Sequence, residues 1–141
     1  MRRETHSAEE TAQAGASLAT RLRPGDSVVV SGELGAGKTT YVRGACRALG
    51  VEGPVTSPTF TIGQVYGGRL PSGEPIEIAH LDLYRLPSLD GEDPALLDDY
   101  VTERRIAFVE WPGAAAALLP RVKARVAIEH LGGDRRVVEV E

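Results

Sequence analysis

The sequence predicts an α/β fold, in which one mixed parallel and antiparallel sheet is flanked by helices. Apolar, strand-like runs alternate with segments of helical periodicity along the 141 residues, a pattern typical of such folds. One apolar strand is followed by G-E-L-G-A-G-K-T at residues 32–39, which matches the phosphate-loop motif G-x-x-x-x-G-K-[ST]. Short Gly/Pro-rich turns join other strands and indicate antiparallel pairs. These features predict a single P-loop NTPase-like domain over residues 1–141.

The N-terminal half is expected to fold as helix, strand, helix. Ser7 followed by Glu10 is a capping-box pattern, which opens the first helix. Residues 24–26, Pro-Gly-Asp, turn the chain into the strand that precedes the phosphate loop. A helical apolar stripe after the loop continues as far as Gly50, a residue typical of the position just after a helix. The expected elements are a helix from Ser7 to about Leu22, a strand at 26–31 and a helix at 38–49.

The rest of the chain is expected to be mostly β-structure. Two strand-like runs are joined by the Gly/Pro-rich residues 67–73, a connection short enough for an antiparallel pair. Asp93 and Pro94 look like the start of a short helix, and Pro112 and Pro120 are expected to open and close another. The expected strands are 59–66, 74–82, 105–110, 122–129 and 135–140, and the expected helices are 93–99 and 112–120.

Composition excludes several classes of function. The net charge of −4 leaves no basic face, so direct binding of a nucleic-acid backbone is not expected. Cys46 is the only cysteine, which excludes an internal disulfide and a Cys-rich zinc site. The longest apolar stretch, 114–119, is far too short to span a bilayer. We therefore expect a cytoplasmic protein with no membrane association.

The phosphate loop predicts nucleotide binding. Its glycines let backbone N–H groups face the phosphates of a nucleotide. Lys38 is expected on the β- and γ-phosphates, and the Thr39 hydroxyl is expected to bind Mg²⁺. The residues expected to contact the nucleotide here are Gly32, Glu33, Leu34, Gly35, Ala36, Gly37, Lys38, Thr39 and Thr40.

Two carboxylates at strand ends are the candidates for metal binding and catalysis. Glu110 follows four apolar residues at 106–109, which is the Walker-B arrangement of a buried strand that delivers an acid to the metal. Asp82 ends another apolar run and lies within H-L-D-L-Y-R. Either carboxylate taken alone is also compatible with a surface acid where a strand meets a loop. Together with Lys38, they form the expected catalytic set.

For three further residues, both a functional and a structural role can be considered. Thr59 lies in T-S-P-T-F-T, whose hydroxyls suit a loop that senses the γ-phosphate, although an ordinary capped turn has the same composition. Trp111 directly follows Glu110, and either core packing or a nucleotide contact would explain it. His80 is a lone histidine in a strand, for which a hydrogen-bonded structural role is favoured over a catalytic one.

Four motifs together resemble one family. They occur in the order and spacing of TsaE, the bacterial ATPase of tRNA threonylcarbamoyladenosine (t⁶A) biosynthesis, and the resemblance extends over about residues 7–128. The motifs are G-E-L-G-A-G-K-T-T at 32–40, T-S-P-T-F at 56–60, H-L-D-L-Y-R at 80–85 and V-E-W-P at 109–112.

The resemblance implies a small Mg²⁺- and ATP-dependent ATPase that works on a complex of TsaD-type and TsaB-type proteins, and reaches tRNA only through that complex. By position, Lys38 and Thr39 contact phosphate and Mg²⁺. Asp82 and Glu110 are the functional carboxylates, Thr59 belongs to a switch-like loop, and Trp111 lies near the nucleotide. Which carboxylate binds the metal and which orients water stays open.

Alternative functions remain at this point. A small-molecule kinase would use residues 80–85 as an acceptor site with Asp82 as base, and a non-hydrolysing sensor would only bind ATP and partners. A GTPase is disfavoured because the chain contains no asparagine and so no N-K-x-D guanine motif. The adenine site is also open, since the N-terminal helix region and the C-terminal hairpin are both within reach.

Overall fold

The computed structural model describes residues 1–33, 36–56, 63–83, 95–110 and 119–141. Within these ranges the chain forms seven strands and three helices. In chain order they are β1 (Arg2–Thr5), α1 (Ala8–Ala19), β2 (Ser27–Gly32), α2 (Lys38–Ala48), β3 (Gly63–Arg69), β4 (Pro75–Asp82), α3 (Ala95–Asp98), β5 (Arg105–Glu110), β6 (Val122–Gly132) and β7 (Arg135–Val140).

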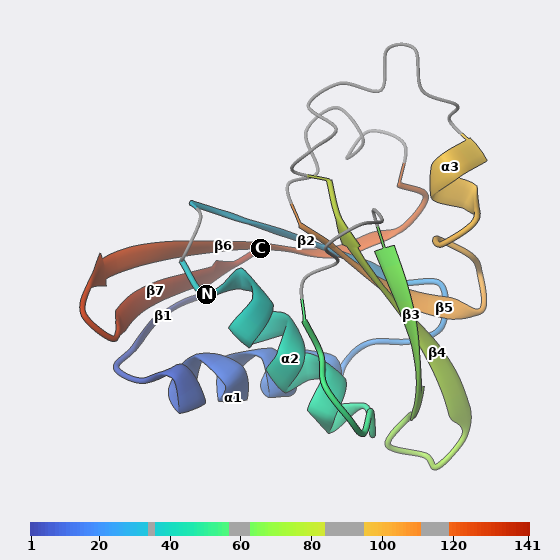
Figure 1. Ribbon diagram of the computed structural model, residues 1–141, viewed down its shortest axis with the longest axis horizontal. Coiled ribbons are helices and arrows are strands. Elements are labelled where there is room, and N and C mark those ends of the chain that lie inside the picture. Colours follow the sequence, from blue (N-terminus) through green and yellow to red (C-terminus); the bar gives the residue numbers. More distant parts are fainter. Residues whose placement is uncertain (34–35, 57–62, 84–94, 111–118) are drawn as a thin grey trace.

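All seven strands belong to one sheet, in the order β1-β7-β6-β2-β5-β4-β3 (Figure 1). The four central strands, β6, β2, β5 and β4, run parallel. Antiparallel pairs complete both edges, with β3 on β4 at one side and β7 and β1 beyond β6 at the other. The expected α/β class with a mixed sheet is confirmed, including the antiparallel pairing across residues 67–73.

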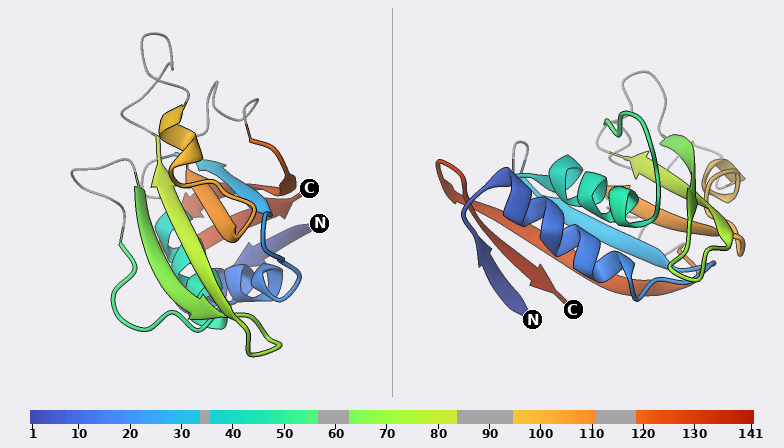
Figure 2. Two further views of the ribbon diagram at one scale, coloured as in Figure 1. Left: turned by 90° about the vertical axis from the view of Figure 1, so that its right-hand side faces the viewer. Right: turned by 90° about the horizontal axis from the view of Figure 1, so that it is seen from below.

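The helices cover the two faces of the sheet unequally. Figures 1 and 2 show α1 and α2 side by side along one face, and this face forms the larger apolar core, with Val28, Val30 and Phe108. Val29 and Leu97 belong to a smaller cluster on the opposite face, where α3 packs. Successive residues of a strand point to opposite faces, so β2 contributes alternately to both clusters.

Helices α1 and α2 approach each other through glycine. A Cβ atom added to Gly15 would lie 2.0 Å from the backbone oxygen of Tyr41, and one added to Gly44 would lie 1.8 Å from the backbone oxygen of Ala12. Only glycine permits backbones to come this close. This contact fixes α2, and therefore the loop that precedes it, against α1 and the sheet.

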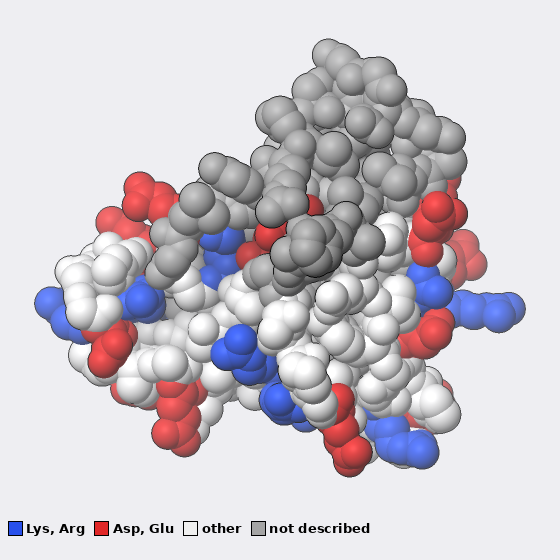
Figure 3. Space-filling model, viewed as in Figure 1, with Lys and Arg blue, Asp and Glu red and all other residues white. Residues whose placement is uncertain are grey.

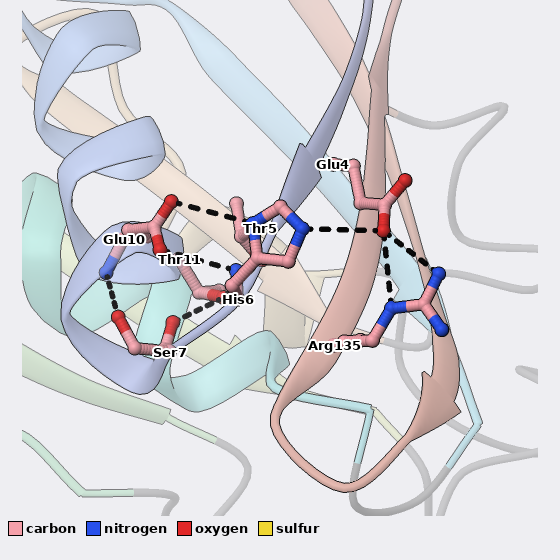
Figure 4. Close-up of polar contacts among 7 residues, drawn as sticks. All are labelled: Glu4, Thr5, His6, Ser7, Glu10, Thr11 and Arg135. Atoms are coloured by element: carbon pink, nitrogen blue, oxygen red, sulfur yellow. Dashed lines mark hydrogen bonds and ion pairs between the residues drawn. The ribbon is translucent and has the colours of Figure 1, made fainter.

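The N-terminus contains a strand that the sequence does not predict. Strand β1 pairs antiparallel with β7, and Glu4 forms an ion pair of 2.9 Å with Arg135 (Figure 4). The hydroxyls of Thr5 and Thr11 form a buried hydrogen bond of 2.7 Å between β1 and α1. The sequence R-R-E-T lacks an apolar alternation because only Thr5 of this edge strand is buried.

The predicted helix start at Ser7 is confirmed, with one difference in its capping box. Ser7 has an extended backbone, and its hydroxyl accepts a hydrogen bond of 3.1 Å from the backbone N–H of Glu10 (Figure 4). The Glu10 carboxylate accepts from the backbone N–H of His6 rather than from that of Ser7, so the capping box is only half formed.

Other boundaries differ by a few residues. Helix α1 ends at Ala19 instead of near Leu22, because the next residues turn the chain before Pro24 and end the helical hydrogen bonding. Strand β6 continues to Gly132, beyond the expected 129, since the long hairpin with β7 extends past the parallel core. The expected helix at 112–120 lies almost wholly outside the described residues, as does the start of the expected strand at 59–66. Among the described residues, the helices are all too short or too polar for a membrane span.

Candidate functional site

The carboxyl ends of three parallel strands meet on the side of the sheet where α2 begins. In the register between β2 and β5, Val30 lies beside Glu110, and in the register between β4 and β5, Asp82 lies beside Glu110. Lys38 opens α2 directly after the loop that leaves β2. In open α/β sheets, ligands bind outside the carboxyl ends of the strands. Two predicted acids and the phosphate-loop lysine are therefore gathered at the expected edge.

The loop after β2 requires glycine at two described positions. Gly32 has φ 150°, and a Cβ atom there would lie 2.5 Å from the backbone oxygen of Ile128 in β6. Gly37 has φ 105° and occupies the N-cap position of α2, where it has no side chain to cap the helix. The positive end of the helix dipole is thus left for an anion. Leu34 and Gly35 lie outside the described residues.

Lys38 is folded back over this loop. Its ammonium group donates hydrogen bonds to the backbone oxygens of Gly32 at 2.9 Å and Glu33 at 2.7 Å. Burial lowers the pKa of Lys38, and the negative charges of Glu110 and Asp82 oppose that shift. A phosphate group bound beside Lys38 would favour its charged form further.

Glu110 is the centre of the buried part of the site. Its carboxylate is 2% exposed, and its Oε2 atom forms a hydrogen bond with Nε2 of His80, which is fully buried. The Thr39 hydroxyl donates to the same oxygen over a long 3.5 Å. The side chains that meet here come from β4, β5 and the first turn of α2.

The donor set fits a small hard cation. Hydroxyl and carboxylate oxygens are the protein ligands that Mg²⁺ prefers, and Mg²⁺ keeps water and phosphate oxygens as further ligands. Thr39, Asp82 and Glu110 provide such oxygens at one strand edge. In the described ranges, no three His, Cys, Asp or Glu side chains form a metal-binding group by themselves, so a bound Mg²⁺ would depend on additional oxygen ligands.

A small depression lies next to the loop and brings together the two regions considered for adenine. It has a volume of about 50 Å³ and is lined by Ala8, Thr11, Gly37, Thr40, Asp134 and Arg136. The Arg136 guanidinium donates from Nε to the backbone oxygen of Ala36 at 2.9 Å, which braces the loop from β7. The N-terminus of α1 and the β6–β7 hairpin therefore both border the loop.

Two larger depressions lie at the opposite edge of the sheet. One of about 860 Å³ is bordered by Asp26 and Val122 at the amino ends of β2 and β6, and one of about 740 Å³ by Pro75 at the start of β4. Neither includes Lys38, Asp82 or Glu110. Size alone therefore does not identify the candidate site.

Only some of the predicted site residues lie in the described part of the chain. The structure brings Lys38, Thr39, Asp82 and Glu110 together, whereas Thr59 and Trp111 lie outside the described residues. His80 is hydrogen-bonded, as expected, but its partner Glu110 was not foreseen, because the two residues come from distant segments. Arg136 was missed entirely, since a single arginine in a strand such as β7 carries no motif.

A family model described as "Threonylcarbamoyl adenosine biosynthesis protein TsaE" matches residues 5–138. The chain belongs to the TsaE family. The match includes the phosphate loop, both strand-end carboxylates and His80, so the resemblance expected from the four motifs is confirmed.

Individual relatives support the same assignment. The TsaE protein of Treponema pallidum is 34% identical over 140 residues, covering 99% of both chains. The TsaE protein of Streptomyces coelicolor is 44% identical over 121 residues, covering 85% of this chain and 79% of the relative. Among solved structures, Bacillus subtilis YdiB superposes with a TM-score of 0.76 at 29% identity, covering 98% of this chain and 82% of that one. The two TsaE relatives are thus similar in sequence over most of this chain, and YdiB shares the fold described above.

Proposed function

We propose that this chain is a Mg²⁺-dependent ATPase that supports t⁶A formation in tRNA. The observation that carries the proposal is that Glu110 accepts a hydrogen bond from Thr39 and interacts electrostatically with Lys38 at the edge where α2 begins. The relatives of this chain are named as tRNA threonylcarbamoyladenosine biosynthesis proteins. These names support the proposed role in t⁶A formation.

The phosphate loop binds the triphosphate. The backbone N–H groups of the first turn of α2 and the ammonium of Lys38 provide the positive partners for it. In the free chain, Lys38 donates to two backbone oxygens of the loop. On ATP binding, the ammonium exchanges these neutral acceptors for charged phosphate oxygens, and hydrogen bonds to charged groups are the stronger ones.

Thr39, Asp82 and Glu110 hold Mg²⁺ in this proposal, directly or through its water ligands. A Mg²⁺ ion held there would supply positive charge against the charge that develops on the phosphate oxygens. The chain itself fixes where the carboxylates lie, because β4 and β5 are paired with Asp82 beside Glu110. The two acids differ in exposure, since Glu110 is buried and Asp82 is half-buried.

We assign Glu110 the task of orienting the attacking water. The oxygen of that water forms a bond to the γ-phosphorus and the bond between γ-phosphorus and the bridging oxygen breaks, which gives ADP and inorganic phosphate; one water proton stays on the phosphate and the other is released to solvent. Lys38 and the loop N–H groups stabilise the negative charge that develops on the phosphate oxygens. Asp82 lies nearer the solvent, and we assign it to holding the metal ion.

Turnover is proposed to depend on a complex of TsaD-type and TsaB-type proteins, with tRNA contacted only through them. Exclusion of water strengthens every charge interaction in such a site. A docked partner provides that exclusion. We therefore expect slow hydrolysis by the chain alone and faster hydrolysis in the complex, where the reaction would sustain repeated rounds of modification.

The first experiment measures ATP binding with Mg²⁺ by calorimetry. The chain has two lysines, which offers a matched pair: Lys38→Ala is expected to abolish detectable binding, whereas Lys123→Ala, an exposed position on β6, leaves it unchanged. Absence of ATP binding by the folded parent chain would overturn the proposal.

The second experiment follows the products. Labelled ATP is incubated with the chain, with and without the TsaB–TsaD-type complex, and reconstituted tRNA modification is measured in parallel. Free phosphate and repeated modification support the ATPase. Label on an added metabolite would instead favour a kinase, and ATP-dependent complex formation without any phosphate release would favour a non-hydrolysing sensor.

A further inference from the structure

His80 and Glu110 form a buried polar pair on the face of the sheet that α2 covers. Side chains two residues apart on a strand share a face, so His80 shares its face of β4 with Asp82 and with the core residue Ile78. On β5, Glu110 likewise follows the core residue Phe108. His80 lies beside Phe108 in the parallel register. The imidazole is thus held in the apolar layer directly beneath the two carboxylates of the site.

The hydrogen bonds of this pair are unevenly distributed. Within the described part of the chain, both hydrogen bonds of the Glu110 carboxylate, from His80 and from Thr39, end on Oε2. At the other side of the ring, Nδ1 of His80 is buried and has no partner among the described residues. A buried N–H without an acceptor is costlier than a bare ring nitrogen, so the ring hydrogen belongs on Nε2, where it is donated to Glu110.

This distribution leaves one carboxylate oxygen for a ligand. A glutamate side chain has three rotatable bonds, and a carboxylate anchored at one oxygen loses most of that freedom. Catalytic groups work best when their orientation is fixed before the substrate arrives. With Oε2 held from below by His80, Oε1 is the atom of Glu110 that remains for water or metal at the strand edge.

We propose that His80 is a positioning residue for Glu110, which holds Oε2 and thereby fixes the direction of Oε1 in the nucleotide site. The inference rests on the proposed ATPase function and adds a residue to it. His80 itself touches no reacting group. It acts through Glu110, in the way that buried partners of metal ligands fix their orientation.

Three substitutions separate the hydrogen bond from the volume of the ring. Glutamine places its amide nitrogen near the position of Nε2, so His80→Gln retains a donor to Glu110. Asparagine ends nearer to Cβ, where Nδ1 lies, so His80→Asn does not reach the carboxylate. His80→Leu fills the space without any donor. Thermal unfolding of each variant establishes that it is folded, and the Gln and Asn pair provides the comparison if the leucine variant is not.

Kinetics on the partner complex give the first readout. His80→Asn and His80→Leu are expected to lower kcat by about 10- to 100-fold, the effect typical of removing the partner of a ligating side chain, with little change in KM for ATP. His80→Gln is expected to recover most of the loss. In a Glu110→Gln background, His80→Asn should cause no further loss, because His80 acts only through Glu110.

A second readout needs no turnover. In crystal structures of the free chain, Glu110 is expected to take one side-chain conformation in the parent and in His80→Gln, and several in His80→Asn or His80→Leu. A single unchanged conformation of Glu110 in a folded His80→Asn chain would overturn the inference, as would equal losses from His80→Asn with and without Glu110→Gln. Failure of the proposed ATPase function is distinguishable from failure of this inference, because in that case the parent chain itself releases no phosphate when bound to its partners.

Discussion

Glu110 is a buried carboxylate whose neighbours carry charge of both signs. Lys38 interacts electrostatically with both Glu110 and Asp82 across the strand edge, and Nε2 of His80 is hydrogen-bonded to Oε2 of Glu110. Burying an ionised carboxylate costs several kcal/mol unless hydrogen bonds and opposite charge offset that cost. An apolar residue at the end of β5 would avoid the cost altogether. The presence of an acid here therefore agrees with a task in binding or catalysis rather than with stabilisation of the fold.

Replacement of Glu110 tests whether the residue acts in ATP binding or in turnover. We expect Glu110→Ala to bind ATP with an affinity close to that of the parent, because the phosphate loop makes most of the contacts. Turnover on the partner complex is expected to fall by about 100-fold or more, the range for loss of a group that handles the attacking water. Calorimetry gives the affinity and phosphate release gives the rate. Hydrolysis at the parent rate by Glu110→Ala would show that its assigned role is wrong.

Cys46 provides a test of the core that is independent of function. The thiol is fully buried in α2 against the sheet, and burial raises its pKa to about 12 from an ordinary value of 9.0. Between these two pH values the unfolded chain has lost the thiol proton while the folded chain retains it. The folded state therefore loses stability as pH rises above 9, whereas below 9 this group contributes no pH dependence.

The expected loss from Cys46 amounts to about 3 kcal/mol by pH 11, by linkage from the two pKa values. Cys46→Ala is expected to be somewhat less stable than the parent at pH 7, because a small cavity remains. Its free energy of unfolding should nevertheless fall less steeply between pH 9 and 11. Urea unfolding at a series of pH values measures both slopes. Parallel slopes for parent and variant would mean that the thiol is not protected in the folded chain.

Helices α1 and α2 act as one support for the phosphate loop. They cross where Gly15 and Gly44 allow backbone-to-backbone contact, and Tyr41 and Ala45 of α2 are fully buried in the same core. The first turn of α2 contains Lys38 and Thr39. Any displacement of α2 away from α1 would therefore move two of the residues proposed to bind Mg²⁺–ATP.

Gly44→Ala tests this support. The added Cβ atom would lie 1.8 Å from the backbone oxygen of Ala12, so the helices must separate, and we expect a loss of about 1–3 kcal/mol in the free energy of unfolding. Gly67→Ala is the matched control, because Gly67 in β3 has no atom within 4 Å of the added Cβ. Its expected change is within about 0.5 kcal/mol. Similar urea midpoints for the two variants would show that α1 and α2 are not packed closely.

Local patterns explain why most elements could be predicted. Helix α1 begins with a cap at Ser7, and β5 is a continuous apolar run because both faces of the central sheet are covered. β1 could not be predicted in the same way. It is an edge strand with one buried residue, Thr5, and it exists because β7 offers a pairing edge. That partner lies more than 130 residues away in the chain.

The site was predictable to the extent that a motif or a strand end marks its residues. Lys38 and Thr39 belong to a contiguous motif, and Glu110 and Asp82 each end an apolar run. Which side chains touch is set by register between strands from distant parts of the chain, and no local pattern contains it. The pairing of His80 with Glu110 depends on the register of β4 and β5, and the contact of Arg136 with Ala36 depends on β7 lying close to the loop before α2.

The described surface carries charges of both signs. On the face shown in Figure 3, acidic and basic side chains are interspersed over the described surface, and the net charge of the full sequence is −4. Direct binding to RNA depends on a concentration of positive charge. In the proposed function, the nucleotide site must then communicate with a protein partner, and its state must change the affinity for that partner.

In the proposed function, ATP binding and docking on the partner complex are coupled, and thermodynamic linkage requires the coupling to be equal in both directions. If Mg²⁺–ATP tightens binding to the TsaB–TsaD-type complex by some factor, the complex must tighten ATP binding by the same factor. We expect about 10-fold or more in each direction, within the usual range of such coupling. Lys38→Ala should lose the ATP-dependent increase in affinity for the complex, and Lys123→Ala should retain it. Interferometry with and without ATP, and calorimetry with and without the complex, measure the two factors. Equal affinity for the partners at zero and saturating ATP would contradict the proposed coupling.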